Sequence, residues 1–301
     1  MNSARPQHVP VLLREVIEWL RPRPGQVLVD GTFGGGGHAR PLAAAVTPGG
    51  KLVGLDRDPQ VVAEGEKEFE GESIRVIHAN FCQLPEVLEG LGLPEVDGML
   101  IDLGWSSDQL ADPQRGFSFD STGPLDMRFD PHRGDPAWRL VERLSEKHLA
   151  DLLYAYGEER LSRRIARSIV RRRREGPIRT AADLASVVRR VVPRPKGRRP
   201  TIDPATRTFQ ALRIAVNDEL NSLETALRRV PDSLRRGGRL AIISYHSLED
   251  RPVKQSFRDD PRWNVLTRRP VRPGAEELDC NPRSRSAKLR VAERSEVAAG
   301  K

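Results

Sequence analysis

Four successive glycines, Gly34–Gly37, follow an aspartate and a phenylalanine in the segment VDGTFGGGGHAR (residues 29–40). Residues without a Cβ cost backbone entropy and pack nothing, so such a run indicates that a ligand approaches the main chain closely. Acids recur further along, since Asp56 ends KLVGLD and Asp102 ends VDGMLID. Carboxylates accept hydrogen bonds from hydroxyl and amino groups. These residue types predict a site for a nucleotide-like ligand.

Three interpretations of the glycine loop compete, and one of them is excluded. A Walker A loop requires Lys followed by Ser or Thr after its last glycine, and His38 stands there instead. A dinucleotide fingerprint, G-x-G-x-x-G/A, is met loosely by Gly34, Gly36 and Ala39. The third interpretation is a loop for S-adenosylmethionine (SAM), whose class I enzymes carry an acid at the end of the first strand. Asp30 supplies that acid.

Two later residues favour an adenosine group in both remaining interpretations. Asp56 follows Asp30 by 26 residues, and a carboxylate there can accept hydrogen bonds from both ribose hydroxyls. Phe81 follows the third predicted strand and is placed to pack against an adenine face, or else it is an ordinary core residue. The loop and these two residues leave both NAD and SAM open.

The fourth predicted strand ends in Asp102-Leu103-Gly104-Trp105. Methyltransferases that act on exocyclic amines carry an acid, Asn or Ser here, then two residues that are usually proline, then an aromatic. The amine lone pair of cytosine or adenine is conjugated into the ring, and a carboxylate that accepts its N–H bonds localises that pair. An adjacent aromatic can hold the base. The D-x-x-W spacing fits this chemistry without the prolines; the alternative role of Asp102 is to cap the next turn.

Short strands must hold these residues at one edge of a sheet. Four β-rich segments end at Asp30, Asp56, Phe81 and Asp102, which lie 26, 25 and 21 residues apart. Helix-compatible stretches separate them, and this alternation is typical of βαβ units and a parallel sheet. Ligands of such sheets bind at the carboxyl ends of the strands.

The alternation stops after Asp102, where helical patterns follow without strands. Strand signal returns in GGRLAIISYHS (residues 237–247). We therefore predict an α/β fold, a doubly wound, mostly parallel sheet with an inserted all-helical domain. Residues 1–108 and 217–301 are expected to form the discontinuous ligand-binding domain, and residues 109–216 a helical, basic substrate-recognition insertion.

The positive charge is concentrated in one segment. The chain carries a net charge of +8, and the stretch from Gly157 to Arg213 holds 17 Lys and Arg against 5 Asp and Glu. The remainder of the chain is therefore acidic, and the local excess predicts a nucleic-acid-binding surface. The alternative is a solvated helix face.

Composition narrows the class further. The chain has 301 residues, 38% apolar and 31% charged, within the globular range. No apolar run approaches the roughly 18–20 residues that span a bilayer, and the N-terminus lacks the features of a signal peptide. Cys82 and Cys280 are the only cysteines, so neither a disulfide framework nor a structural zinc is expected. The expected location is the reducing cytoplasm.

Beyond these features, the chain resembles the bacterial RsmH (MraW) family from His8 to about Arg290. The resemblance rests on blocks that occur in the family's order and spacing. They are HVPVLL, DGTFGGGGH, LDRDP, DLGWSSDQL, RGFSFDSTGPLDMRFD, TFQALRIAVNDEL, SYHSLEDR and NPRSRSAKLR.

The resemblance implies a class I, Rossmann-like, SAM-dependent methyltransferase. It implies that SAM donates a methyl group to N4 of a cytidine in the decoding region of 16S ribosomal RNA, so that the partner is the small ribosomal subunit. Monomer and homodimer both stay open. Carried over by motif, the cofactor contacts fall on Gly36, Gly37, His38, Asp56, Phe81, Asp102 and Gln109. Three residues depart from the family pattern and leave the pocket wall and the following turn open: Trp105, Asp108 and Pro252.

The segment SYHSLEDR is expected to face the same crevice, with Tyr245 and His246 as candidate catalytic residues beside Asp102. Either could position the base or accept the proton that the methylated amine must lose, and His246 fits a scaffolding role better. A sulfonium is already an activated electrophile, so no metal is expected, and positioning and electrostatics supply the catalysis.

Two alternatives remain at this point. One is an amino-methyltransferase that acts on DNA, which requires the same chemistry. The other is a non-catalytic RNA-binding assembly factor that keeps SAM as a structural ligand, and the intact motif at Asp102 weighs against it.

Overall fold

The computed structural model describes residues 10–104, 110, 112–192 and 203–296. The chain divides into two compact units, one of residues 1–105 and 220–301 and the other of residues 106–219. The sequence placed the corresponding boundaries at residues 108/109 and 216/217. Each unit is described by itself.

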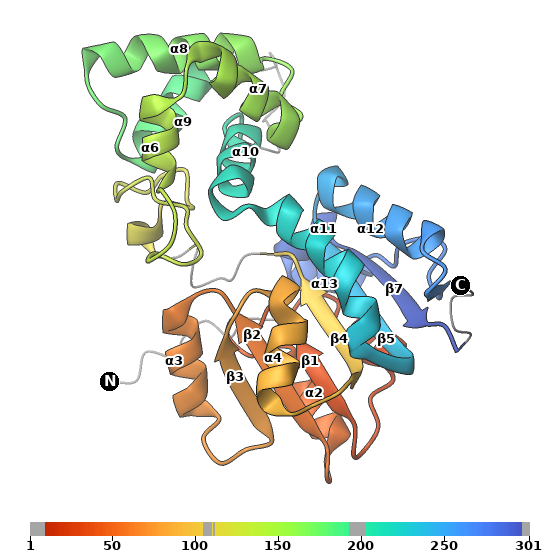
Figure 1. Ribbon diagram of the computed structural model, residues 1–301. Helices are drawn as coiled ribbons and strands as arrows, with labels where there is room; N and C mark the ends of the chain where they lie inside the picture. The colour runs from red at the N-terminus through yellow and green to blue at the C-terminus, as the bar shows by residue number, and fades with distance from the viewer. Residues whose placement is uncertain (1–9, 105–109, 111, 193–202, 297–301) are drawn as a thin grey trace. The chain divides into compact units, whose positions relative to one another are not determined.

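The first unit is built on a seven-stranded sheet in the order β3-β2-β1-β4-β5-β7-β6 (Figure 1). Its strands are β1 (Val27–Asp30), β2 (Lys51–Asp56), β3 (Ile74–His78), β4 (Val96–Asp102), β5 (Leu234–Ser244), β6 (Trp263–Val265) and β7 (Lys288–Arg294). The first five pair in parallel, and β7 pairs antiparallel with β5 and β6. The predicted doubly wound, mostly parallel sheet is confirmed. Strand order reverses between β1 and β4, and this switch point is where doubly wound sheets bind ligands.

Two apolar clusters cover the two faces of the sheet. Alternate strand residues point to opposite faces, so Leu28 and Leu100 join one cluster while Val29 and Met99 join the other. The first cluster packs on α1 (Leu13–Leu20), α2 (Ala39–Val46) and α3 (Pro59–Glu68). The second packs on α4 (Leu84–Leu91), α11 (Glu219–Arg229) and α12 (Ser247–Asp259). A short helix, α13 (Ala275–Cys280), and the 3₁₀ turns η1 (Phe81–Gln83), η3 (Val230–Ser233) and η4 (Pro282–Ser286) complete the unit.

One local expectation at the end of the third strand differs from the structure. The sequence extends the third strand to Phe81, but β3 ends at His78 and Phe81 begins η1. Asn80 stops the strand, because its side chain accepts a hydrogen bond from the Cys82 N–H and its own N–H donates to Gln83 Oε1. Pro252, one of the three departures from the family pattern, lies inside α12, which continues unbroken to Asp259.

The second unit is helical, with α6 (Ala137–Arg143), α7 (Glu146–Gly157), α8 (Ser162–Glu175), α9 (Ala181–Val191) and α10 (Thr206–Asn217) after the 3₁₀ turn η2 (Pro113–Arg115). Two helices begin at capping side chains: Ser145 accepts from the His148 N–H before α7, and Thr180 accepts from the Asp183 N–H before α9. The sequence predicts one long amphipathic stretch after residue 203. The structure divides it into α10 and α11 at Asp218, whose φ of 50° ends the first helix.

Candidate active site

The predicted site residues of the sheet come together at the carboxyl ends of four neighbouring strands. Asp56 ends β2, Asp30 ends β1, Asp102 ends β4, and Tyr245 directly follows β5. Strand β1 lies between β2 and β4, and Asp30 pairs in register with Gly54 on one side and Leu100 on the other. Three carboxylates therefore share one edge of the sheet.

The glycine loop folds back on the end of β2. The Gly34 N–H donates to Asp56 Oδ2 over 2.8 Å, and the Phe33 N–H donates to Leu55 O over 2.9 Å. Gly36 has a φ of +75°, and a Cβ built there would lie 3.0 Å from the Phe69 ring. This glycine is therefore required by the fold itself. Gly37 lies in the turn that leads into α2 and is half-buried.

Asp56 is oriented by backbone donors. Its Oδ2 accepts from Gly34 and its Oδ1 accepts from the Asp58 N–H over 2.9 Å. Burial raises the pKa of Asp56, and these two N–H bonds lower it in part. A carboxylate oxygen accepts more than one hydrogen bond, so both oxygens of the fixed carboxylate retain capacity for ligand hydroxyls.

Asp30 is a buried carboxylate with hydrogen bonds to only one of its two oxygens among the described residues. It is 1% exposed; its Oδ1 accepts from the Thr32 N–H, and its Oδ2 has no hydrogen-bond partner among the described residues. Burial is the main cause that raises its pKa to about 6, and the charges of Asp102 and Asp56 raise it further against the opposing effect of His38. In the sequence, Asp30 was identified as the acid that ends the first strand of SAM-binding enzymes, but it was not included among the cofactor contacts.

Asp102 and Tyr245 form a hydrogen-bonded pair across the sheet edge. The Tyr245 hydroxyl donates to Asp102 Oδ1 over 2.9 Å, and the Gly104 N–H donates to the same oxygen over 3.0 Å. Burial, and then the charge of Asp102, raises the pKa of Tyr245 well above its ordinary value. Tyr245 is therefore a hydrogen-bond donor to Asp102, which favours a positioning role, and its predicted place among the catalytic residues stays a prediction.

Gly104 is required by that pair. A Cβ built on Gly104 would lie 2.9 Å from Tyr245 Cε2 and 3.1 Å from Asp102 Oδ1. Real Cβ atoms do not approach that closely, so a side chain at residue 104 would displace the tyrosine ring. This contact accounts for glycine at a position where amine methyltransferases usually carry proline.

His246 is the N-cap of α12 and lies beside a buried carboxylate that the sequence analysis missed. Glu249 is 2% exposed, and its Oε2 accepts from the Tyr245 N–H over 2.7 Å and from the His246 N–H over 3.3 Å. His246 Nε2 lies 3.0 Å from Glu249 Oε1, and the two residues form a capping box at the start of the helix. The available signal was an acid three residues after a helix start.

Glu249→Ala is expected to lower the free energy of unfolding by about 1–3 kcal/mol, because it leaves the N–H groups of Tyr245 and His246 without their acceptor. Glu249→Gln keeps an oxygen at that position and is expected to recover most of the loss. Urea unfolding of the two variants at neutral pH measures the difference. Equal stability of the two variants would contradict this role.

Two predicted cofactor contacts have structural partners of their own. His38 is 6% exposed, and its Nε2 lies 2.9 Å from Val11 O, which fixes the ring against the segment before α1. Phe81 is 8% exposed and packs within the apolar cluster that includes Leu55 and Met99. Contact of either side chain with a cofactor stays a prediction.

Gln109, the last predicted cofactor contact, lies outside the described residues, as do Trp105 and Asp108. Within the described ranges, no group of three or more His, Cys, Asp or Glu side chains is arranged to hold a metal ion. None of the helices in these ranges is long and apolar enough to cross a membrane.

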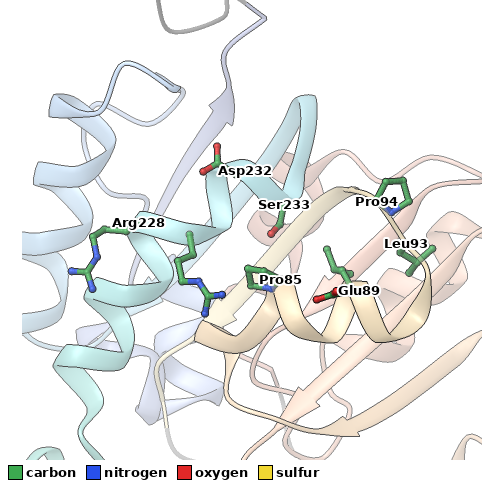
Figure 2. Close-up of a pocket in the computed structure, with 9 residues that line it drawn as sticks. Pro85, Glu89, Leu93, Pro94, Arg228, Asp232 and Ser233 are labelled. Carbon is green, nitrogen blue, oxygen red and sulfur yellow. The ribbon is translucent and has the colours of Figure 1, made fainter. Parts of the chain in front are cut away.

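A separate pocket of about 480 Å³ lies at the opposite end of the strands (Figure 2). Ser233, which lines it, directly precedes β5, and Pro94 lies two residues before β4. Two of its charged lining residues are paired, since Arg229 donates to Glu86 and Asp232 accepts from Arg262. This pocket is therefore no part of the carboxylate site.

The carboxylate site suits a positively charged ligand. The charges of Asp102 and Asp56 contribute to the raised pKa of Asp30, and His38 opposes them. Buried carboxylates are stabilised by an adjacent positive charge, and a ligand can supply one. Backbone N–H groups orient Asp56, while one buried oxygen of Asp30 has no hydrogen-bond partner among the described residues.

Comparison with known proteins shows which family the chain matches. A family model described as the MraW methylase family matches residues 5–295. The chain is 47% identical over 306 residues to ribosomal RNA small subunit methyltransferase H of Rhodopirellula baltica, with 98% of this chain and 94% of that protein covered. It is 50% identical over 291 residues to the protein of the same name from Sorangium cellulosum, with 96% and 91% covered. Among solved structures, an rRNA methylase from Streptococcus thermophilus gives a TM-score of 0.43 at 12% identity, with 98% of this chain and 100% of that chain covered.

Proposed function

The chain belongs to the MraW methylase family, and from this membership we propose that it methylates 16S ribosomal RNA of the small subunit, using SAM. The target we propose is N4 of a cytidine in the decoding region, as the sequence resemblance implied. The relatives carry the name of a ribosomal RNA small subunit methyltransferase. The relatives' names support the ribosomal RNA substrate, while the motif at Asp102 and the sequence resemblance support N4 as the methylated atom.

The single observation that carries the cofactor assignment is the carboxylate site beside the glycine loop. SAM, when bound, supplies an activated methyl group on a cationic sulfonium. Asp30 is buried, and its Oδ2 has no hydrogen-bond partner among the described residues. A positive charge nearby would stabilise its ionised form. The residues present therefore fit the group.

Asp56 and Asp102 have distinct proposed roles. The fixed carboxylate of Asp56 accepts the ribose hydroxyls, and Asp102 accepts N–H bonds from the cofactor or from the target amine. Tyr245 holds Asp102 through Oδ1 and leaves Oδ2 for that contact. These residues orient the reacting groups, and no strong base is required because the methylated amine loses its proton readily to water.

Asp56→Ala is expected to weaken SAM binding by roughly 1.5–3 kcal/mol, because it removes a charged hydrogen-bond acceptor. Calorimetric titration with SAM measures the change. Asp279→Ala, which removes an exposed carboxylate of α13, is the matched control and is expected to bind SAM as the wild type does. Unchanged affinity in Asp56→Ala would remove Asp56 from the site.

The helical unit is proposed to hold the RNA. It carries the basic excess between Gly157 and Arg213, and RNA binding by arginine-rich surfaces depends on neutralising phosphates. A paired cytosine cannot present N4 to a methyl group at a sheet edge, so the target base must leave its stack.

The proposed reaction is tested by transfer of tritium from methyl-labelled SAM. Small ribosomal subunits, free 16S RNA and DNA are offered in parallel, and the labelled nucleoside is then identified after digestion. Label in N4-methylcytidine from small subunits or their RNA is the expected result. Label in DNA alone would instead make the protein a DNA amino-methyltransferase, and SAM binding without transfer to any polymer would make it a non-catalytic assembly factor.

A further inference from the structure

The arginines of α8 divide between two sides of the helix. Arg164, Arg167, Arg171 and Arg174 follow one another at spacings of three, four and three residues, which places them on one face over about 15 Å. All four are exposed. The opposite side carries the buried residues Ser162, Ile165, Ala166 and Ile169.

Two neighbouring arginines have structural partners instead. The Arg173 guanidinium donates to Val141 O and Leu144 O over 2.7 and 2.8 Å, and so caps the last turn of α6. Arg172 donates to Gly176 O over 2.9 Å at the end of its own helix. These two cations contribute to the fold of the unit.

The exposed face keeps its charge largely uncompensated. Arg167 pairs with Glu146 at 3.2 Å, on the surface. Arg164, Arg171 and Arg174 make no hydrogen bond or ion pair with any residue that the structure describes. Three unpaired guanidinium groups in a row repel one another, and an anionic partner relieves that repulsion.

A pocket of about 440 Å³ lies at the C-terminal end of this face. It is lined by Val141, Glu142, Arg173, Arg174, Pro177, Ile178 and Arg179. Arg174 belongs both to the face and to the pocket. The Arg179 guanidinium lies 3.8 Å above the Trp138 ring, and its side chain is 44% exposed. Arg179 also donates to Glu142 Oε1 over 3.0 Å, so the indole and this carboxylate together hold the half-exposed guanidinium at the pocket.

We propose that a single strand of RNA lies along the exposed face of α8, with its phosphates on Arg164, Arg171 and Arg174. At the end of the face, one unpaired base stacks on Arg179, and Trp138 supports the guanidinium from below. Unpaired bases in RNA are commonly stacked on guanidinium planes and aromatic rings. This inference rests on the proposed function and names the surface that holds its RNA.

The phosphate contacts are tested by Arg171→Gln combined with Arg174→Gln. Binding of a short unstructured RNA oligonucleotide, without SAM, is measured over a range of salt concentrations. The double variant is expected to bind roughly tenfold more weakly at low salt, and its log–log salt slope is expected to be smaller by about 0.7 for each lost contact. The control is Arg235→Gln with Arg258→Gln, which removes two exposed arginines of the other unit that pair with Asp97 and Asp259.

An unchanged slope in the α8 variant, or an equal change in the control, would overturn the phosphate contacts. The stacked base is tested by Arg179→Lys, which keeps the charge but loses the plane. It is expected to weaken RNA binding at least threefold with an unchanged salt slope. Wild-type affinity in Arg179→Lys would overturn the stacked base.

Failure of this inference and failure of the proposed function are distinguishable. If the wild type transfers no methyl group but its RNA binding depends on the α8 arginines, the proposed function is rejected and the RNA surface stands. If the wild type transfers methyl groups and the salt slope is the same without Arg171 and Arg174, the RNA surface is rejected and the proposed function stands.

Discussion

Asp30→Asn is expected to remove a pH dependence of stability worth about 3 kcal/mol from the cofactor-free protein. In the folded state the Asp30 pKa is raised to about 6 from an ordinary 3.8, mainly by burial. The folded protein therefore binds more protons than the unfolded chain between these values. Its stability must fall as pH rises through this window, and the full cost of the buried charge is present above pH 6.

The measurement is urea unfolding of both proteins at pH values from 4 to 7.5. The stability difference between Asp30→Asn and the wild type is expected to move in favour of the variant as pH rises, while Asp279→Asn follows the wild type throughout. Asn also buries an amide N–H₂, so the slope of the difference is the diagnostic quantity. Parallel curves for the variant and the wild type would contradict the raised pKa.

The same charge should govern cofactor binding. A cationic ligand requires ionised Asp30, so the SAM affinity of the wild type is expected to fall below about pH 6, by up to tenfold per pH unit. Asp30→Asn is expected to bind SAM roughly 10- to 100-fold more weakly than the wild type does above pH 6, with an affinity that does not change with pH. A variant that binds SAM as tightly as the wild type would place the cofactor's charge elsewhere.

If the cofactor is the main partner of Asp102, as we propose, Asp102→Asn is expected to weaken SAM binding and to leave turnover at saturating SAM nearly intact. Asn keeps an oxygen that can accept from Tyr245 and Gly104, so the local geometry survives and only the charge is lost. Calorimetry gives the SAM affinity, and methyl transfer to small subunits at saturating SAM gives kcat.

The opposite result has a definite meaning. If Asp102 polarises the target amine, kcat should fall by roughly 10²-fold or more while SAM affinity stays unchanged. That outcome would reject the cofactor role. Tyr245→Phe keeps the ring and removes the donor, so a similar split in that variant would show that the hydroxyl acts through Asp102.

Periodicity and strand ends were sufficient to predict the five parallel strands of the sheet, but not β6 and β7, which pair antiparallel. Asp30, Asp56 and Asp102 end β1, β2 and β4 as expected, because apolar β-branched runs closed by an acid are local signals. Local signals failed at two positions: the Asn80 side chain capped a 3₁₀ turn and ended β3 early, and the left-handed backbone of Asp218 divided one amphipathic stretch into two helices. Neither position carries the glycine or proline that usually marks such breaks.

The site was predictable only in part, since its other contacts join residues far apart in the chain. Tyr245 meets Asp102 across 143 positions, and Glu249 matters because it fixes the segment that holds Tyr245. The basic segment shows the same limit. Arg173 and Arg174 are equivalent in composition, yet Arg173 donates a hydrogen bond to α6 while Arg174 stays exposed.

The contact between Gly104 and Tyr245 also constrains how this motif can evolve. A side chain at residue 104 collides with the tyrosine ring, so a proline, as in the D-P-P pattern of other amine methyltransferases, is incompatible with the ring where it lies. Loss of the tyrosine alone removes the donor that holds Asp102. The two positions are therefore coupled sterically: a larger residue at position 104 requires a smaller or displaced side chain at position 245, and Asp102 then loses its hydroxyl donor.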